Sequence, residues 1–528
     1  MATVLKSFLS GEWRAGSGKR AELVNPSTEE VLAEASTEGL DFRGALSFAR
    51  EKGGRALRAM SFAQRGELLK KLAKVVADAR EELIALGLAN AGNTRSDAKF
   101  DIDGASATLM YYAELGSTLG EARFLADGEG IPIGRSARLF GQHLLVPREG
   151  VAVQINAFNF PAWGMGEKLA AALLAGMPVI SKPATSTAMM AHRMAELWAQ
   201  SGALPEGAFS FVCGSIGDLL SHLGPQDVVA FTGSGQTAAQ LRRLDNLARQ
   251  NIHLNVEADS LNSMVLGRDV ELGTEAMNLF FSDVVKEMTQ KAGQKCTAVR
   301  RIYVPRDRMD QVREELVQRL SEVRVGNPAD ERAQMGPVAT AQQLRDVRAG
   351  IDQLARSSEV ATGGSKPIDA AGVPPGKGYF VAPTMLLLSN PSIEADVNGL
   401  EVFGPVATLM PFAQTAALVN LIVAGGGGLV SSIYSDERRF IEEVVAGIAP
   451  HHGRLTIAGE KVAGQSVPPG TVLPQLLHGG PGRAGGGEEL GGMRGLALYQ
   501  QRVALQGHRP LVEHLAGTLK DSAHSSRA

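Results

Sequence analysis

The sequence predicts an α/β fold in which parallel strands alternate with crossover helices. Between residues 151 and 256, strand candidates alternate with stretches of helical periodicity, and a second alternating segment runs from 257 to about 475. The chain has 528 residues, of which 44% are hydrophobic, so it can bury large cores in two or three domains. These observations favour a Rossmann-like domain followed by a second α/β domain.

The elements follow one another in a clear order. Residues 1–40 contain short strand-like runs, residues 41–115 have helical periodicity, and residues 136–156 return to strand around a Pro-Arg-Glu-Gly turn. Four strands are then predicted at 151–155, 178–181, 208–212 and 228–232, with helices at 164–176, 187–201 and 236–250 between them. We expect a late strand at 454–458 and a C-terminal return, over 495–515, to the strands near 136–150.

Two glycine-rich segments are candidates for phosphate binding. Gly233-Ser-Gly235-Gln-Thr-Ala238 follows a predicted strand and opens a helix, so a pyrophosphate could approach its backbone N–H groups closely. Glu257 then lies near the spacing expected of a ribose-binding acid, which is one interpretation of that residue. Gly480-Pro-Gly482-Arg-Ala-Gly485 has no strand before it and is predicted to be a loop without a phosphate.

Composition excludes several classes of function. The net charge of −3 favours neither nucleic acid nor an anionic membrane surface as a partner. No signal peptide or membrane span is evident, and two cysteines are too few for a disulfide framework, so we expect a cytoplasmic protein. The ten histidines show no pairing at metal-ligand spacing, and we therefore expect no catalytic metal.

One cysteine has the surroundings of a nucleophile. A helical pattern over 272–290 precedes Cys296 and a strand over 299–304 follows it, with Gly293 breaking the chain between them. Cys296 is therefore predicted on a loop between two rigid elements, where it is either a nucleophile or a buried structural thiol. Cys213 lies in an apolar run and is predicted to serve packing.

Five ordered motifs resemble the aldehyde dehydrogenase superfamily. Besides the loop Gly293-Gln-Lys-Cys296, they are Phe158-Asn159-Phe160-Pro161, Ser181-Lys182-Pro183, Phe231-Thr232-Gly233-Ser234, the acid Glu257 and Glu401-Val-Phe-Gly404-Pro405. The resemblance implies that family's fold, with a Rossmann-like cofactor domain, an α/β catalytic domain and a small β arm for oligomerisation. It places the cofactor domain at 1–135 and 151–256, the catalytic domain at 257–475, and the arm and C-terminal segment at 136–150 and 476–528. It also implies a homodimer or a dimer of dimers.

The resemblance assigns roles to the catalytic residues. Cys296 is the implied nucleophile, Asn159 the oxyanion donor together with the Cys296 backbone N–H, and Glu257 the general base, for which we expect a raised pKa. Lys168 matches a lysine near the nicotinamide end, and Glu489 a second acid that takes part in proton transfer. The sequence departs from the family at 258–260, where Ala-Asp-Ser replaces Leu-Gly-Gly and leaves the conformation of Glu257 open.

The resemblance also implies a dinucleotide site. Its residues are Lys182 and Ser181 at the adenosine ribose, Gly233 and Ser234 at the phosphates, and Glu401 and Phe403 at the nicotinamide ribose. Where members that prefer NAD commonly have a glutamate, this chain has Thr185, which can donate a hydrogen bond to a 2′-phosphate that a carboxylate would repel. We therefore expect NADP as the cofactor, with NAD as a weaker alternative.

The segment 478–492 narrows the resemblance. With residues 156–161 and 256–260, it is similar to the branch that oxidises CoA-thioester semialdehydes in aerobic aromatic-acid breakdown. The expected reaction is NADP-dependent oxidation of such a semialdehyde to the acid, through a Cys296 thiohemiacetal and a thioester that water hydrolyses. Alternatives are a general or other-semialdehyde NAD(P)-dependent enzyme, the ring-opened phenylacetyl-CoA pathway enzyme, an acylating enzyme that uses CoA in place of water, and a non-catalytic protein that keeps only the fold.

Overall fold

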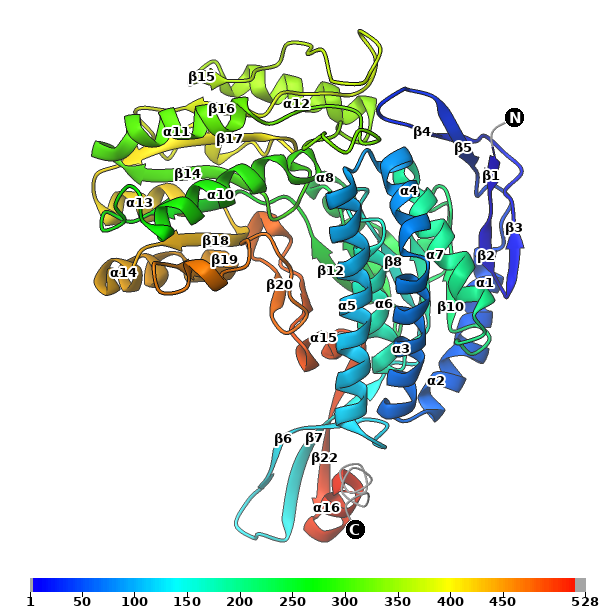
Figure 1. Cartoon of the computed structure of the whole chain (residues 1–528). Helices are drawn as coiled ribbons and strands as arrows, with labels where there is room; N and C mark the ends of the chain where they lie inside the picture. The colour runs from blue at the N-terminus through cyan, green and yellow to red at the C-terminus, as the bar shows by residue number, and fades with distance from the viewer. Residues whose placement is uncertain (1–2, 518–528) are drawn as a thin grey trace.

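A computed structural model of the chain describes residues 3–517. Within these residues lie two large sheets that are covered by helices, and a small three-stranded sheet that projects from the body of the molecule (Figure 1). The predicted polar tail at 521–528 lies outside the described residues. The α/β class predicted from the sequence is confirmed.

The first sheet carries the strands of the predicted Rossmann-like domain. Within the described chain its seven strands run in the order β12 (His253–Glu257), β11 (Val228–Thr232), β8 (Ala152–Ile155), β9 (Val179–Lys182), β10 (Phe209–Phe211), β2 (Ser7–Leu9) and β3 (Glu12–Arg14). The five strands from β12 to β10 are parallel, and β2 and β3 extend the sheet as antiparallel strands.

Neighbouring residues of these strands enter two different cores. Val179 and Val228 belong to the core under α3 (Phe62–Asp78), α5 (Arg95–Leu119), α6 (Trp163–Ala175) and α7 (Ala188–Gln200). Ile180 and Val229 belong to the opposite core, under α1 (Phe42–Phe48), α8 (Gly235–Arg242) and α9 (Asp245–Arg249). Burial on both faces explains why the strands are continuous apolar runs. The single helix predicted over 236–250 is two helices, because Leu244 is extended between them.

The second sheet has the same layered build. Within residues 3–517 its seven strands run in the order β15 (Glu359–Thr362), β16 (Thr384–Leu387), β17 (Val406–Phe412), β14 (Val299–Pro305), β13 (Asn262–Leu266), β18 (Gly428–Tyr434) and β19 (His452–Ala458). One face packs on α10 (Glu275–Thr289) and α11 (Met309–Ser321). The other packs on α12 (Ala341–Leu354), α13 (Thr415–Val423) and α14 (Arg438–Ile448).

Smaller elements complete the chain. The N-terminal segment adds a sheet of β1 (Thr3–Leu5), β5 (Val31–Ala35) and β4 (Ala21–Val24), and α2 (Arg55–Ala59) and α4 (Arg80–Ala91) belong to the helical region that follows. A hairpin of β20 (Leu477–Gly479) and β21 (Glu488–Leu490) precedes α15 (Met493–Ala497). Among the described helices, none is both long and apolar enough to cross a membrane.

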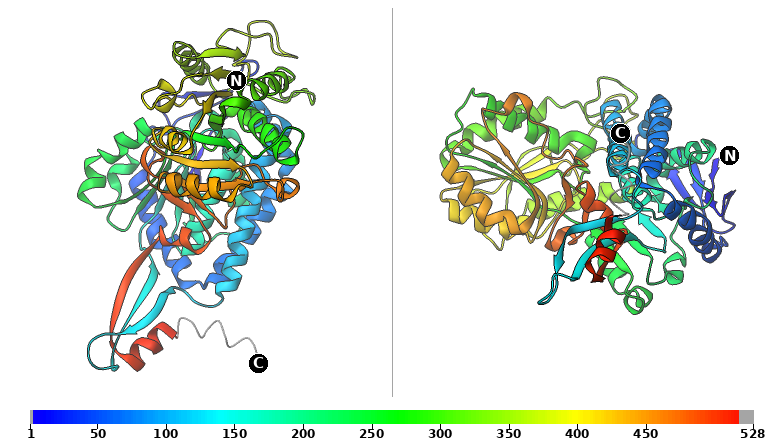
Figure 2. Two further views of the ribbon diagram at one scale, coloured as in Figure 1. Left: turned by 90° about the vertical axis from the view of Figure 1, so that its left-hand side faces the viewer. Right: turned by 90° about the horizontal axis from the view of Figure 1, so that it is seen from below.

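The projecting arm joins distant parts of the sequence (Figure 2). It consists of β6 (Leu125–Pro132), β7 (Leu139–Pro147) and β22 (Gln500–His508), and α16 (Arg509–Gly517) follows β22. The predicted return of the C-terminal segment is confirmed, since β22 pairs with β7 from Gln500–Pro147 to His508–Leu139. The arm begins at Leu125, before the boundary predicted at 136, because β6 pairs with β7. Its role in oligomerisation stays a prediction.

Candidate active site

The predicted nucleophile lies on a strained loop between α10 and β14. Lys291, Ala292 and Gly293 have successive φ values of 54°, 52° and 67°, all in the left-handed region. Such a conformation costs about 1–3 kcal/mol for each non-glycine residue and persists only where its surroundings enforce it. Glycine is required at 293 because a Cβ there would lie 2.2 Å from the Gly404 carbonyl oxygen. The predicted placement of Cys296 between two rigid elements is confirmed.

Hydrogen bonds hold this loop rigidly. Asn262 donates through Nδ2 to the carbonyl oxygens of Cys296 at 2.7 Å and of Ala298 at 2.8 Å. Arg300 donates to the Gly404 carbonyl oxygen at 2.8 Å. The side chain of Lys295 is buried and its Nζ lies 2.7 Å from Glu287 Oε2. Lys295 therefore neutralises Glu287, although it is the sequence neighbour of the thiol.

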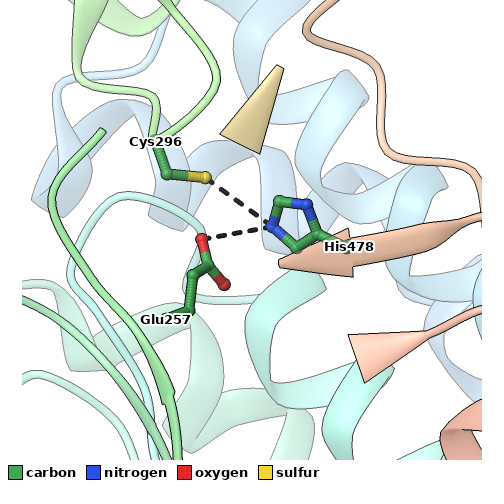
Figure 3. Close-up of side chains that lie close together, drawn as sticks. All are labelled: Glu257, Cys296 and His478. Carbon is green, nitrogen blue, oxygen red and sulfur yellow. Dashed lines mark hydrogen bonds and ion pairs between the residues drawn. The ribbon is translucent and has the colours of Figure 1, made fainter. Parts of the chain in front are cut away.

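Three ionisable groups from separate elements meet at the thiol (Figure 3). His478 Nε2, on β20, lies 3.8 Å from Cys296 Sγ and 3.1 Å from Oε1 of Glu257, the last residue of β12. Burial and the Glu257 carboxylate raise the pKa of Cys296 well above its ordinary value. In this arrangement Cys296 is therefore a neutral thiol at neutral pH.

The pKa of Glu257 moves opposite to the expectation from sequence. Burial alone would raise it, but the positive charges of His478 and Lys168 lower it below the ordinary value. The expectation of a raised pKa is wrong for this arrangement because His478, which carries the nearest charge, was not foreseen. A carboxylate held in this way is a poor base until its hydrogen bond to His478 is released.

The backbone beyond Glu257 is fixed without glycines. Asp259 Oδ1 accepts a hydrogen bond from the Gly235 N–H at 2.8 Å, and the Ser260 N–H donates to Glu401 Oε2 at 2.9 Å. Residues 258–260 all lie outside the left-handed region. The replacement of Leu-Gly-Gly by Ala-Asp-Ser therefore costs no backbone strain, and it ties the end of β12 to α8 and to Glu401.

A second charged group lies against Glu257. Lys168 Nζ is buried 2.9 Å from Glu489 Oε2 and 3.3 Å from Glu167 Oε1. Oxygen atoms of Glu167, Glu257 and Glu489 lie within 4.8 Å of one another. Burial would lower the pKa of Lys168, but Glu489 and Glu167 raise it above its ordinary value. Burial raises the pKa of Glu167 to about 7 against the attraction of Lys168.

A narrow pocket leads to the thiol from one side. Its volume is about 40 Å³, and aromatic rings of Phe100, Phe160 and Trp163 form its walls together with Val472. These rings meet edge to face, with centroids 5.1 Å apart for Phe100 and Trp163. Asn159 lines this pocket beside Cys296. The pocket fits a small reacting group held between apolar walls.

A much larger cleft reaches the thiol from the other side. Its volume is about 600 Å³, and it is lined by five predicted cofactor residues, Lys182, Gly233, Ser234, Glu401 and Phe403. Cys296, Asn159 and Glu257 border both this cleft and the narrow pocket. The size is that of a ligand site for a molecule as large as a dinucleotide. The two cavities therefore meet at Cys296, Asn159 and Glu257.

Two predicted cofactor residues lie away from the lining of the cleft in the described chain. Ser181 is fully buried, and its Oγ accepts a hydrogen bond from Asn156 Nδ2 at 3.2 Å. Since successive residues of a strand face opposite sides, Ser181 points away when Lys182 faces the cleft. Thr185 begins a short 3-10 helix just beyond Ala184, which lines the cleft. The Ser181 side chain is therefore turned away from the cleft in this structure, and Thr185 stands next to the lining; their contacts with a cofactor stay predictions.

The glycine-rich segment after His478 folds against β12. The Gly487 N–H donates to the Val256 carbonyl oxygen at 2.9 Å, and the Ala258 N–H donates to Ala484 at 3.0 Å. A Cβ at Gly485 or Gly487 would lie 2.4 Å from that Val256 oxygen. The glycines therefore let the segment approach the strand that carries Glu257.

The family model that describes the aldehyde dehydrogenase family matches residues 13–499, which is most of the chain. The chain belongs to the aldehyde dehydrogenase family. The resemblance seen in the ordered motifs is thus confirmed, and a thiol, an amide and a carboxylate of these motifs line one pocket around Cys296.

Named relatives of this aldehyde dehydrogenase include a 3,4-dehydroadipyl-CoA semialdehyde dehydrogenase of Aromatoleum evansii. The two are 42% identical over 477 residues, which cover 90% of this chain and 93% of the relative. An aldehyde dehydrogenase of Bacillus cereus, solved as an NAD⁺ complex, is 25% identical with a TM-score of 0.82, and 96% of each chain is covered. A 3,6-anhydro-L-galactose dehydrogenase has a TM-score of 0.83 at 22% identity, covering 96% of this chain and 100% of its own.

Sequence reasoning missed three residues of this aldehyde dehydrogenase site. His478 and Arg483 lie in the segment 478–492, which served only to narrow the resemblance, and Glu167 had no predicted role. Arg483 lines the cleft, and its Nη2 donates to the Gly399 carbonyl oxygen at 2.6 Å. A buried carboxylate next to a lysine in an apolar helix was the available signal for Glu167.

Proposed function

We propose that this aldehyde dehydrogenase oxidises a CoA-thioester semialdehyde, 3,4-didehydroadipyl-CoA semialdehyde, to the free carboxylic acid with NADP. The observation that carries the proposal is the meeting of Cys296, Asn159 and Glu257 where the narrow pocket joins the large cleft. The relative of Aromatoleum evansii, 42% identical over 90% of this chain, supports the choice of a CoA-linked substrate.

Cys296 starts the reaction as a nucleophile. The thiol proton passes to Glu257 as sulfur attacks the aldehyde carbon, which gives a thiohemiacetal with its charge on oxygen. The Asn159 amide and the Cys296 backbone N–H donate hydrogen bonds to that oxygen. Removal of one such donor typically slows a reaction by about 10²–10³. The rigid loop around Cys296 holds the backbone N–H of Cys296 in place before substrate arrives.

The residues of the cleft fit a dinucleotide. Arg483 Nη1 is buried with no hydrogen-bond partner among the described residues, which suits an anionic ligand. Lys182 would hold the adenosine ribose, Gly233 and Ser234 the pyrophosphate at the start of α8, and Glu401 the nicotinamide ribose beside Phe403. When bound, the oxidised nicotinamide accepts the hydride that leaves the thiohemiacetal carbon. Thr185, just beyond the lining, favours NADP over NAD because it lacks the charge that repels a 2′-phosphate.

Glu257 completes the reaction by activating water. It removes a proton from the water that attacks the Cys296 thioester, and the carboxylic acid leaves as the thiolate is restored. Before that step Glu257 passes the thiol proton to Glu489, on its way to solvent, and the Lys168 ammonium stabilises the charge of these carboxylates. Water as the attacking group separates this route from an acylating route, which would transfer the acyl group to CoA.

Two other substrates remain as alternatives. The first is a simple aldehyde or another semialdehyde, which an NAD(P)-dependent enzyme of this kind can oxidise with the chemistry at Cys296 alone. The second is the ring-opened semialdehyde of phenylacetyl-CoA breakdown, which also carries a CoA thioester. NADPH formation, followed by absorbance with the CoA-linked substrate, its CoA-free analogue and the phenylacetyl pathway semialdehyde, separates them. We expect the highest kcat/KM with the first substrate and NADP, and a free acid as product. Equal rates with simple aldehydes would contradict the proposed substrate.

We also propose that the enzyme is a homodimer or a dimer of dimers assembled through the arm. The arm and α16 expose large apolar side chains, among them Leu139 at 47%, Val503 at 44% and Leu511 at 55%. Apolar exposure on a projecting sheet is typical of a surface that a partner covers. Light scattering on the purified chain tests this, with a monomer as the contradicting result.

A further inference from the structure

A histidine occupies the space between the nucleophile and the general base. His478 Nε2 lies 3.8 Å from Cys296 Sγ and 3.1 Å from Glu257 Oε1, so one N–H faces two groups that exchange a negative charge (Figure 3). Neither composition nor the ordered motifs pointed to this residue. We propose that His478 is a further catalytic residue, whose cationic N–H moves from the Glu257 carboxylate to the Cys296 thiolate as the thiol loses its proton.

The hairpin that carries His478 holds its ring in place. His478 on β20 stands opposite Glu489 on β21, so both side chains leave the same face of the hairpin toward the active site. The loop between these strands is bonded to β12 through Gly487 and Ala484, next to Glu257. His478 is buried, with only 5% of its surface exposed. The distances to sulfur and carboxylate are therefore set by the fold.

Charge balance explains why a cation is needed here. Before reaction the group contains a neutral thiol, the Glu257 carboxylate and the His478 imidazolium, so its net charge is zero. When the Sγ–H bond breaks and an O–H bond forms on Glu257, the charges are a thiolate, a neutral carboxylic acid and the same imidazolium, again zero. The Nε2–H bond stays intact and only its hydrogen bond moves. Without His478 the negative charge would be buried without its nearest counterion.

Other charges around His478 support its cationic form. Burial alone would lower the pKa of His478, and Arg454 on β19 acts in the same direction, but Glu257 and Glu167 raise it above the ordinary value. Lys168 and Glu489, also in this cluster, pair with each other at 2.9 Å. The negative neighbours from β12 and α6 thus outweigh Arg454.

The test is the reactivity of Cys296 in the purified full-length enzyme without aldehyde or NADP. Iodoacetamide alkylation is measured between pH 6 and 9 by peptide mass spectrometry, which separates Cys296 from Cys213. We expect His478→Phe and His478→Gln to slow alkylation at neutral pH by about ten- to a hundred-fold, and to move its pH profile upward, because an opposite charge within about 4–6 Å favours the charged form. Two variants are used so that the test can still be made if one of them does not fold.

A double variant separates direct action on sulfur from simple support of Glu257. If His478 acts on sulfur, Glu257→Gln/His478→Gln is alkylated more slowly than Glu257→Gln alone. His452→Gln is the matched control, since His452 is a buried histidine outside both cavities whose Nδ1 lies 2.9 Å from the Ile448 carbonyl oxygen. We expect its alkylation profile to equal that of the wild type.

The proposal is overturned if the double variant and Glu257→Gln react at the same rate, or if folded His478 variants keep the wild-type profile. Folding is checked by thermal unfolding and by NADP binding. The inference rests on the proposed function only in taking Cys296 as nucleophile, because alkylation needs no substrate. A failure to oxidise CoA-linked semialdehydes would therefore contradict the proposed substrate and leave the alkylation result intact.

Discussion

The narrow pocket and the large cleft meet at Cys296, but their charged side chains are paired differently. In the pocket, ionisable groups are buried against one another, as in the contacts of Lys168 with Glu489 at 2.9 Å and of His478 with Glu257 at 3.1 Å. In the cleft, Lys182 lines the open space as a half-buried side chain, and Arg483 Nη1 lacks a partner within the described residues. The charged side chains at the pocket therefore pair with one another, whereas Lys182 and Arg483 in the cleft can bind a ligand.

Because of this difference, the narrow pocket and the large cleft should respond differently to substitution. A charge removed from the pocket leaves a buried partner uncompensated, so both stability and chemistry should suffer. A charge removed from the cleft leaves no partner behind, so binding should weaken while folding is kept. The two regions can therefore be told apart by measuring stability, cofactor affinity and turnover on the same set of variants.

The largest effect is expected from loss of the nucleophile. Cys296→Ala should lower kcat by about 10⁴–10⁶-fold, since no other thiol can form the thiohemiacetal. Its affinity for NADP, measured by fluorescence titration, should stay close to that of the wild type because Lys182, Glu401 and Arg483 are unchanged. Turnover is measured by NADPH absorbance.

The second cysteine is the matched control for that variant. Cys213 is fully buried and burial raises the pKa of its thiol to about 12, so it is unreactive at neutral pH. Cys213→Ala should lose some stability and keep its turnover. Equal loss of turnover in both variants would contradict the assignment of Cys296.

The next largest effect is expected on stability, and it should differ between Lys168 in the pocket and Lys182 in the cleft. Lys168→Met should lower the free energy of unfolding by about 3–5 kcal/mol, because Glu489 and Glu167 lose their buried counterion. Lys182→Met should keep stability within about 0.5 kcal/mol, as a substitution without a paired charge does, and should weaken NADP binding instead. Urea unfolding and NADP titration of both variants give the comparison. Similar stabilities would break the contrast between pocket and cleft.

The loss in Lys168→Met should depend on pH in a defined direction. Glu167 has its folded pKa raised to about 7, above the unfolded value of about 4.3. Stability from such a carboxyl is fully present below the unfolded pKa and is lost as pH rises through the folded pKa. The Lys168 charge holds this pKa down, so its removal should raise the folded pKa of Glu167 further. The variant should therefore be closest to the wild type near pH 5 and furthest from it near pH 8.

Most of the fold could be predicted from periodicity, and the reasons are visible in particular elements. β11 has the predicted bounds at 228–232 because its residues enter two cores and leave a continuous apolar run. The break between α8 and α9 was missed, since Leu244 continues the helical pattern while its backbone is extended. β6 was missed as part of the arm because its pairing with β7 is a long-range contact that local pattern does not report.

The site residues that belong to ordered motifs could be predicted from the sequence. Those that reach the site only through the packing of the folded chain could not. Cys296, Asn159 and Glu257 were placed by ordered motifs, but His478 became visible only when the hairpin was seen against β12. The lowered pKa of Glu257 depends on that same contact, so no sequence pattern could give its direction. Ser181 was assigned to the cofactor because it adjoins Lys182, although strand alternation turns it the other way.

The smallest effect concerns the choice between NADP and NAD. Thr185→Glu should lower the kcat/KM ratio of NADP to NAD by about tenfold, equivalent to roughly 1.4 kcal/mol, since a carboxylate near the adenosine ribose repels a 2′-phosphate. Thr187→Ser is a suitable control, because the Thr187 hydroxyl donates to the Phe158 carbonyl oxygen at 2.8 Å and serine can keep that bond. An unchanged ratio in Thr185→Glu would place cofactor choice elsewhere in the cleft.

A single-turnover experiment on Glu257→Gln separates formation of the Cys296 thioester from its hydrolysis. The variant is mixed with NADP and the CoA-linked semialdehyde, NADPH is followed by stopped-flow absorbance, and the protein is then analysed by peptide mass spectrometry. If Cys296 forms the thioester and Glu257 activates water, about one NADPH per active site should appear before turnover nearly stops, with the acyl group on Cys296. NADPH formation at the steady rate of the wild type, or an adduct on another residue, would contradict the account.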